Sequence, residues 1–411
     1  MNWKHVSLGE ISVNIQTGPF GSQLHQSDYS EKGTPVVMPK DLISGHISEE
    51  SIARVSDDHV ERLSRHKIEV GDILYSRRGD VGRCAFASET EAGWLCGTGC
   101  LRVTIDSRKA NPKFVFYQLL KADTIGWVEK HAVGSTMLNL NTSILSSVPI
   151  DLPSHDKQNH IVGVLSAYDD LIENNQKQIK LSEEAAQRLY KEWFVDLRFP
   201  GHETTPIVDG VPDGWTYKPF SEVFDYVRGK SYTSKELSDT TGILMANLKN
   251  IRAFGGYNRN AEKRFTGQYK ANQMLYAGDI VMGVTDMTQE RRLVGHVALV
   301  PDLGEKMTFS MDLIKIIPKL TDNLFLYSAM YYGGLSKQIS PLANGVNVLH
   351  LKPEAMMGIE MLIPTKDILE RYHQQFAPMV TRIEALQKQC DVAAEARDRL
   401  IPKLMNREIE V

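Results

Sequence analysis

The feature that most constrains this chain is an internal repeat at a constant offset of 211 residues. Ile172-Glu173 matches Ile383-Glu384, and Gln176-Lys177-Gln178 matches Gln387-Lys388-Gln389. Between positions 172 and 189, 9 of 18 residues are identical to their counterparts, where chance would give about one. Upstream of these tails the two halves diverge. This pattern indicates one scaffold that carries two different recognition modules.

The composition is that of a globular protein with more than one domain. The chain has 411 residues, of which 42% are hydrophobic and 24% charged. No apolar run approaches the ~18–20 residues of a membrane span, and the first residues lack a secretory signal, so we expect a cytoplasmic protein. The formal net charge of −4 neither predicts nor excludes a polyanionic partner, because such binding depends on local basic surface.

Both tails carry apolar residues in alternating steps of four and three, the spacing of a coiled coil. The sequence predicts long helices over 153–199 and 363–411, with helix-pairing positions at Leu165, Ile172, Ile179, Leu189, Ile383, Leu386 and Leu400. A helix of ~35–40 residues is ~50–60 Å long and cannot bury an apolar stripe alone. We expect the two to pack on each other in antiparallel orientation, because a parallel pair would crowd both heads at one end. The alternative is that each helix packs only on its own head.

The heads, residues 1–152 and 215–362, mix short β-type runs with turns and a few helical stretches. The Pro- and Gly-rich linker 200–214 is expected to lack regular structure. Strands and helices do not alternate regularly, which argues against a doubly wound sheet. The predicted fold class is α+β, with two mixed α/β domains joined by two long helices that form an antiparallel coiled coil, and a pseudo-twofold internal repeat.

Loops in both heads combine Gly, Ser, Asn and Gln with basic residues. Arg can pair in bidentate fashion with guanine and Asn or Gln with adenine, whereas Lys, Ser and backbone N–H groups hold phosphate. Any one of these residues is more often part of a solvated turn, but the set in both heads favours DNA contact. The candidate DNA-binding residues are Ser22, Gln23, Lys40, Arg77, Arg78, Ser135, Asn139, Arg228, Lys230, Tyr232, Asn247, Lys249, Arg291, Arg292 and Asn347.

The sequence offers little for catalysis or cofactor binding. The segment 111–114, Asn-Pro-Lys-Phe, is similar to the Asn-Pro-Pro-Phe loop of amino-methyltransferases, but Lys113 replaces the second proline and no Gly-rich loop precedes it. We interpret this segment as a helix start with proline in its first turn. The spacing of Cys84, Cys96 and Cys100 is a weak zinc pattern. We predict a recognition protein with no catalytic residues, no metal site and no cofactor of its own.

With these features the chain resembles the DNA-specificity subunit of type I restriction-modification enzymes over essentially its whole length. The resemblance lies in the layout of two heads and two helices, in Gly18-Pro-Phe-Gly-Ser-Gln-Leu24, in the Leu152-Pro153 and Ile363-Pro364 junctions, and in the helical stretch 165–175. It implies two target-recognition domains, each of which reads one half of a bipartite, asymmetric DNA site. It also implies that the helices set the spacer between the halves.

The resemblance further implies partner subunits. Two methyltransferase subunits would dock on the helices and two motor-nuclease subunits would join for restriction, with S-adenosylmethionine, ATP and Mg²⁺ bound by those partners. Two other hypotheses belong to different classes. A self-sufficient DNA adenine methyltransferase would bind S-adenosylmethionine by itself, and a coiled-coil scaffold would organise partners without touching DNA.

Overall fold

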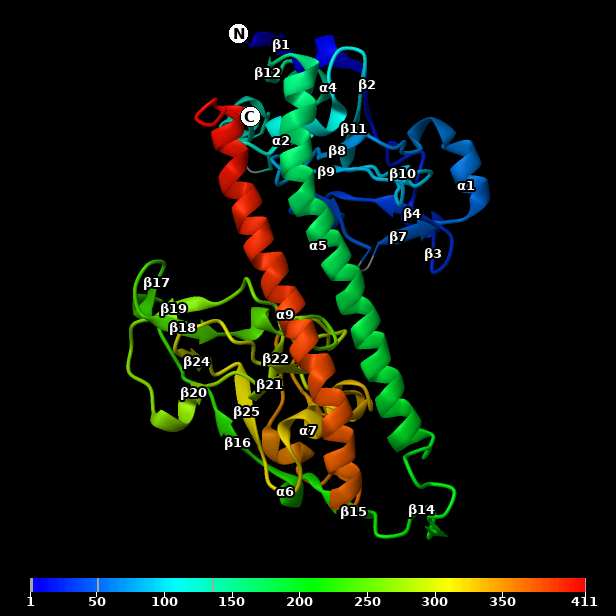
Figure 1. Cartoon of the computed structure of the whole chain (residues 1–411), viewed down its shortest axis with the longest axis vertical. Helices are drawn as coiled ribbons and strands as arrows, with labels where there is room; N and C mark the ends of the chain where they lie inside the picture. The colour runs from blue at the N-terminus through cyan, green and yellow to red at the C-terminus, as the bar shows by residue number, and fades with distance from the viewer. Residues whose placement is uncertain (1–2, 50–51, 135–136, 411) are drawn as a thin grey trace. The chain divides into compact units, whose positions relative to one another are not determined.

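The computed structural model describes residues 3–49, 52–134 and 137–410. The chain forms two compact units, Met1–Asn174 with Gln389–Val411, and Asn175–Lys388. Each unit contains one head and a stretch of both long helices (Figure 1). None of the described helices combines the length and the apolar character that a membrane span requires.

The first head is built on two four-stranded sheets, with orders β2-β11-β8-β9 and β10-β4-β7-β3. All pairs are antiparallel except β10 with β4. The strands of these sheets are β2 (Ser12–Thr17), β3 (Tyr29–Ser30), β4 (Thr34–Val37), β7 (Ala53–Val55), β8 (Ile73–Ser76), β9 (Cys84–Phe86), β10 (Leu95–Cys96) and β11 (Cys100–Ile105). A small hairpin and four helices complete the head: β5 (Leu42–Ile43), β6 (His46–Ile47), α1 (Asp57–Arg62), α2 (Pro112–Leu119), α3 (Ala122–His131) and α4 (Thr142–Ser146).

The second head repeats the strand order of both sheets despite its different sequence, with one strand added at the edge of its second sheet. Its sheets have the orders β16-β25-β21-β23 and β17-β19-β18-β24-β20, and β18 with β24 is again the one parallel pair among these strands. The strands are β16 (Phe224–Arg228), β17 (Leu237–Ser238), β18 (Ile243–Ala246), β19 (Lys263–Phe265), β20 (Met274–Leu275), β21 (Ile280–Gly283), β23 (Val297–Leu299), β24 (Met307–Phe309) and β25 (Leu313–Pro318). The remaining elements are β22 (Thr285–Asp286), β26 (Leu349–His350), α6 (Phe220–Val223), α7 (Asn323–Tyr331) and α8 (Leu335–Ile339).

Each head is closed by a strand pair that joins its two ends. β1 (Lys4–Ser7) pairs with β12 (Pro149–Leu152), and β15 (Thr216–Pro219) pairs with β27 (Glu360–Ile363), both antiparallel. A tryptophan precedes the first strand of each pair, Trp3 at 7% exposure and Trp215 at 4%. Burial of these rings beside the closing strands anchors both ends of each head in its core.

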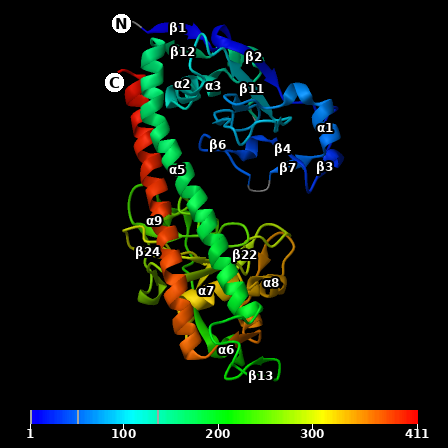
Figure 2. The same cartoon turned by 45° about the vertical axis from the view of Figure 1, so that its right-hand side comes forward.

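The long helices α5 (His155–Tyr190) and α9 (Lys366–Met405) lie side by side within each unit, as both views show (Figure 1 and Figure 2). In the first unit Asp169 contacts Arg397 and Ile172 contacts Cys390, and in the second Gln178 contacts Arg382. One sequence number rises as the other falls, so the helices run antiparallel in both units. Their apolar faces also enter the cores of the heads. The helices therefore pack on each other and on the heads together.

The predicted pairing positions lie on this shared face. Leu165, Ile172 and Leu386 are buried, with Leu165 fully so, while the other four are half-buried: Ile179, Leu189, Ile383 and Leu400. Asn175, the polar residue at a seam position, is 2% exposed. The α+β class with two long helices is confirmed.

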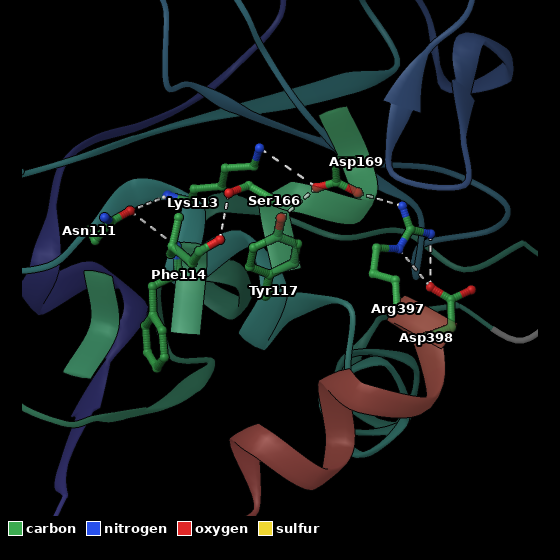
Figure 3. A network of polar contacts seen from close by, with 9 residues as sticks. Asn111, Lys113, Phe114, Tyr117, Ser166, Asp169, Arg397 and Asp398 are labelled. Atoms are coloured by element: carbon green, nitrogen blue, oxygen red, sulfur yellow. Dashed lines mark hydrogen bonds and ion pairs between the residues drawn. The ribbon is translucent and has the colours of Figure 1, made fainter. Parts of the chain in front are cut away.

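A buried polar network ties α2 to both long helices in the first unit (Figure 3). The Asp169 carboxylate accepts hydrogen bonds from Arg397 at 2.8 Å and from the Tyr117 hydroxyl at 2.5 Å. The Lys113 ammonium lies 3.7 Å from the same carboxylate. Burial, together with the neighbouring Asp169 charge, raises the pKa of Tyr117 far above its usual value. Three elements are thus held at one charged centre, which fixes the first head on the helix pair.

Two details differ from the sequence prediction. The linker is not wholly irregular, because β13 (Ile207–Val208) and β14 (Val211–Pro212) form a hairpin around Asp209-Gly210, both of which have positive φ. The helix boundaries also move: α5 changes to a π-helical turn at Lys191–Val195, and α9 continues through Pro402 to Met405. Short hairpins and helix ends depend on local turn chemistry and tertiary support more than on apolar periodicity.

Candidate nucleic-acid interface

Three segments that carry predicted DNA-binding residues meet in the first head. They are the 18–23 loop, the 76–83 loop and the 133–139 turn. Arg77 is at their centre: its amide donates to Gly99 O at 2.8 Å and its carbonyl accepts from Leu140 N at 2.8 Å. Its guanidinium lies over the Phe20 ring, with 5.9 Å to the centroid. The arginine is therefore positioned by backbone bonds and by a ring contact.

The second head brings the corresponding segments together in the same way. Leu351 N donates to Val284 O at 2.8 Å, which corresponds to the Leu140–Arg77 bond: the two donors are 211 residues apart and the two acceptors 207. Lys230 N donates to Phe309 O and Met311 N donates to Lys230 O, at 2.8 and 2.9 Å. The 228–233 segment, the 286–295 loop and the 344–350 turn thus gather beside the 309–312 segment.

The described residues of the 133–139 segment share two backbone features with the 344–350 turn. Val133 and Asn139 exchange both backbone hydrogen bonds, and so do Asn344 and His350, at distances of 2.8 to 3.0 Å. Gly134 and Gly345 have φ of +122° and +151°. A Cβ at Gly345 would stand 1.9 Å from Val348 O, so a side chain is excluded there. In both heads the segment is therefore closed by the same pair of backbone hydrogen bonds and has a glycine of positive φ as its second residue.

The 286–295 loop is held from inside by one carboxylate. Asp286 is fully buried and accepts hydrogen bonds from the amides of Thr288, Leu293 and Val294 and from the Thr288 hydroxyl. Burial acts to raise the pKa of Asp286, but these hydrogen bonds outweigh it and hold the pKa below its usual value. An ionised carboxylate with four donors gives this loop a fixed shape.

The structure distributes the predicted DNA-binding residues between open and engaged positions. Ser22, Lys40, Arg78, Arg228, Lys249 and Asn347 are exposed, and a second group is half-buried: Gln23, Arg77, Asn139, Lys230, Tyr232, Arg291 and Arg292. Ser135 lies outside the described residues. Several polar groups are engaged within the head, so exposure alone does not define the surface.

Two residues of the second head have side chains occupied by internal contacts. Asn247 is 4% exposed, and its amide donates to Asn250 Oδ1 and to Ala261 O. Arg228 donates to both carboxylate oxygens of Glu354, at 2.9 and 3.1 Å. Hydrogen bonds from Tyr226 and Arg228 lower the pKa of Glu354 to about 2. Asn247 shapes its loop, and Arg228 is neutralised by a neighbouring carboxylate.

Sequence reasoning missed the apolar residues at the loop ends. Phe20 is 52% exposed beside Arg77, Met287 is 78% exposed and Val346 is 88% exposed. A search for polar base-contacting side chains passes over them, although Val346 stands directly before Asn347, one of the predicted DNA-binding residues. An apolar residue inside a Gly- and Asn-rich turn is the signal that could have marked it.

The methyltransferase-like segment has a structural role. The Asn111 side chain accepts hydrogen bonds from Lys113 N and Phe114 N at the start of α2, and its amide group donates to Asn159. This is an ordinary N-cap followed by proline. The interpretation of this segment as a helix start is confirmed.

Comparison with known proteins agrees with this architecture. Residues 1–183 match the family described as type I restriction modification DNA specificity domain. The MjaIX specificity subunit of Methanocaldococcus jannaschii is 27% identical over 92% of this chain and 87% of its own length, and the HindI specificity subunit of Haemophilus influenzae is 21% identical over 99% and 100%. In fold, the S subunit of a type I system from M. genitalium has a TM-score of 0.57 at 14% identity, covering 98% of this chain and 96% of its own. Over most of its length the chain is therefore similar to the DNA-specificity subunits of type I restriction-modification enzymes.

Proposed function

We propose that this chain is the sequence-specific DNA-binding subunit of a type I restriction-modification complex. Residues 1–152 and 215–362 form its two target-recognition domains, each of which reads one half of a bipartite, asymmetric site. The linker 200–214 and the helical segments 153–199 and 363–411 connect them. The chain contributes recognition and no catalysis.

The observation that carries this proposal is that the two heads share a backbone arrangement but place different side chains on it. The Leu140–Arg77 and Leu351–Val284 hydrogen bonds place the same backbone at the same point of each head, yet one head has a half-buried arginine there and the other a buried valine. Two heads of one topology with unlike loop chemistry would recognise unlike half-sites, in contrast to a symmetric dimer, which reads a palindrome.

The helices are proposed to set the spacer and to carry the partner subunits. α5 and α9 each contribute to both units, and each keeps a polar, helix-forming outer face. Two methyltransferase subunits would dock on these helices and two motor-nuclease subunits would complete the restriction complex. S-adenosylmethionine, ATP and Mg²⁺ would be bound by those partners.

The proposal is tested by mapping methylated adenines in cells that express the complex, first with this chain and then with a chain whose residues 1–152 come from another family member. The expected result is a bipartite site of which only one half changes after the exchange. A change in both halves, or methylation with no bipartite motif, would contradict the division of labour between the heads.

A second experiment tests the helices as a spacer. Seven residues are inserted after Asn175 in α5 and seven at the facing position of α9, after Gln387, so that the pairing face is kept. Seven residues add ~10.5 Å of helix, which equals about three base-pair steps of ~3.4 Å. The mapped site should gain about three unspecified base pairs with both half-sites unchanged, and altered half-sites would refute a spacer role. A chain with the insertion in α5 alone is the control, because it breaks the register of the pair.

A further inference from the structure

The two most exposed large apolar side chains in the described part of the chain lie on adjoining loops of the second head. Val346 is 88% exposed and Met287 is 78% exposed. β22 and β26 pair Thr285 with His350 and Asp286 with Leu349, and the Gln289 side-chain amide donates to Val346 O at 2.7 Å. The two side chains are therefore presented from one small surface, which we call the 287/346 tip.

The loops that carry the 287/346 tip are rigidly constructed. The buried Asp286 carboxylate fixes the residues on both sides of Met287, and the turn at Gly345 admits no side chain. On the other side of the loop, Phe254 N donates to Arg292 O at 2.7 Å. These rigid loops keep the two apolar side chains exposed to water. A ligand that covers them would remove apolar surface from water, which lowers the free energy of the complex.

The surroundings of the tip favour nucleic acid over protein as that ligand. Arg291 and Arg292 follow in the same loop, with Glu290 paired to Arg292, and the amides of Asn344 and Asn347 flank Val346. Two apolar side chains among arginines and amides are too few for a stable protein interface, which needs ~1,000 Å² of buried surface. Guanidinium groups suit phosphate or guanine, amides suit adenine, and an apolar contact suits the 5-methyl group of thymine.

We propose that Val346 and Met287 contact a thymine 5-methyl group in the half-site read by the second head, and so determine specificity at that base pair. The inference rests on the proposed DNA-binding function and adds the chemistry that one part of its surface reads. It requires at least one thymine, on either strand, in that half-site.

The test uses the complex of the full chain with its methyltransferase subunits and a duplex that contains the mapped site. Each thymine of the second half-site is replaced in turn by deoxyuridine, which lacks only the methyl group, and the Kd is measured by fluorescence anisotropy. One replacement should weaken binding by the wild type about 4-fold, because a buried methyl group is worth ~0.8 kcal/mol. For Val346→Ser or Met287→Gln, the thymine and deoxyuridine duplexes should bind equally at that position.

Matched controls separate this inference from the function on which it rests. Val208→Ser removes another exposed valine, 50% exposed in the linker hairpin, and should keep the wild-type preference for thymine. Deoxyuridine in the first half-site should affect wild type and Val346→Ser alike. If wild type binds every substituted duplex as well as the original, or if both tip variants keep the discrimination, the inference is wrong. Failure of the wild type to prefer its mapped site over random DNA would instead refute the proposed function.

Discussion

Arg397 of α9 donates a hydrogen bond to Asp169 of α5 at 2.8 Å, and both residues are more than nine-tenths buried. At the offset of the repeat, Asp169 corresponds to Val380 and Arg397 to Ala186. The second unit therefore has apolar residues where the first has an ion pair. Antiparallel pairing of two copies of the same helix would set Asp169 against alanine or Arg397 against valine. The ion pair thus favours the pairing of α5 with α9 over the pairing of either helix with itself.

Arg397→Ala should lower the free energy of unfolding of the full chain by about 3–5 kcal/mol, because it leaves the Asp169 carboxylate buried without its main partner. A triple variant, Asp169→Leu with Arg397→Met and Tyr117→Phe, should recover most of that loss, since it removes the three buried members of the network and leaves only the half-buried Lys113. Urea denaturation measures both. Arg399→Ala, which removes an exposed arginine of the same helix, is the control and should change stability by less than ~0.5 kcal/mol. Equal effects of Arg397→Ala and Arg399→Ala would show that the buried pair contributes nothing.

The long helices could be predicted from sequence because a repeated seven-residue pattern over ~35 residues has few other solutions. Their antiparallel pairing followed from the order of heads and helices along the chain. The ion pair could not be predicted. Arg397 occupies an apolar position of the seven-residue pattern, and from the sequence alone it could equally have been an exposed residue that interrupts this pattern. Only the structure shows that Asp169, 228 residues away, faces it.

Gly345→Ala should weaken recognition of the second half-site at least ~10-fold and leave the first unchanged. The added Cβ would stand 1.9 Å from Val348 O at a φ of +151°, so the turn must change shape. Kd values for duplexes altered in one half-site at a time give the answer. Gly358→Ala is the matched control, because a Cβ there meets nothing within 4 Å. A Gly345→Ala chain with wild-type discrimination at both halves would exclude this turn from the DNA surface.

The candidate site could be predicted as segments but not as contacts. Gly-, Asn- and Arg-rich runs marked loops that the structure gathers around Arg77 in one head and around the 309–312 segment in the other, and their contact with DNA stays a prediction. Whether a side chain within such a run is free depends on neighbours distant in sequence. Arg228 is paired with Glu354, 126 residues away, and the side-chain amide of Asn247 donates a hydrogen bond to Ala261 O.

Stability should fall with acidification between about pH 6.5 and pH 4 because of His66. Its side chain is fully buried, and burial together with the nearby charges of Arg65 and Arg102 lowers its pKa to about 4. Between these pH values His66 binds a proton in the unfolded chain but stays neutral in the folded chain. Its contribution to the free energy of unfolding is therefore complete above the ordinary pKa of 6.5 and declines as the pH falls toward 4. The total is at most roughly 3 kcal/mol.

The measurement is the free energy of unfolding at pH 7, 5.5 and 4.5 for wild type and His66→Gln. The variant should show a shallower decline than wild type, whatever its stability at pH 7. The exposed His25→Gln serves as control and should keep the wild-type slope. A decline in His66→Gln as steep as that in the wild type would assign the pH dependence to other groups.

Replacing Arg291 and Arg292 together by alanine should reduce the salt dependence of DNA binding. Each phosphate contact contributes ~0.9 to the slope of log K against log salt concentration. Loss of two such contacts should flatten the slope by up to about two and weaken binding to all sequences alike. Arg77→Ala with Arg78→Ala should act in the same way through the first head.

If either double variant instead abolishes the preference at one base pair and leaves the slope unchanged, those arginines read a base edge. Arg188→Ala, which removes an arginine with 82% of its side chain exposed on α5, is the control and should leave the slope unchanged. Unchanged affinity and slope in both double variants would remove these loops from the interface and favour a scaffold that does not contact DNA.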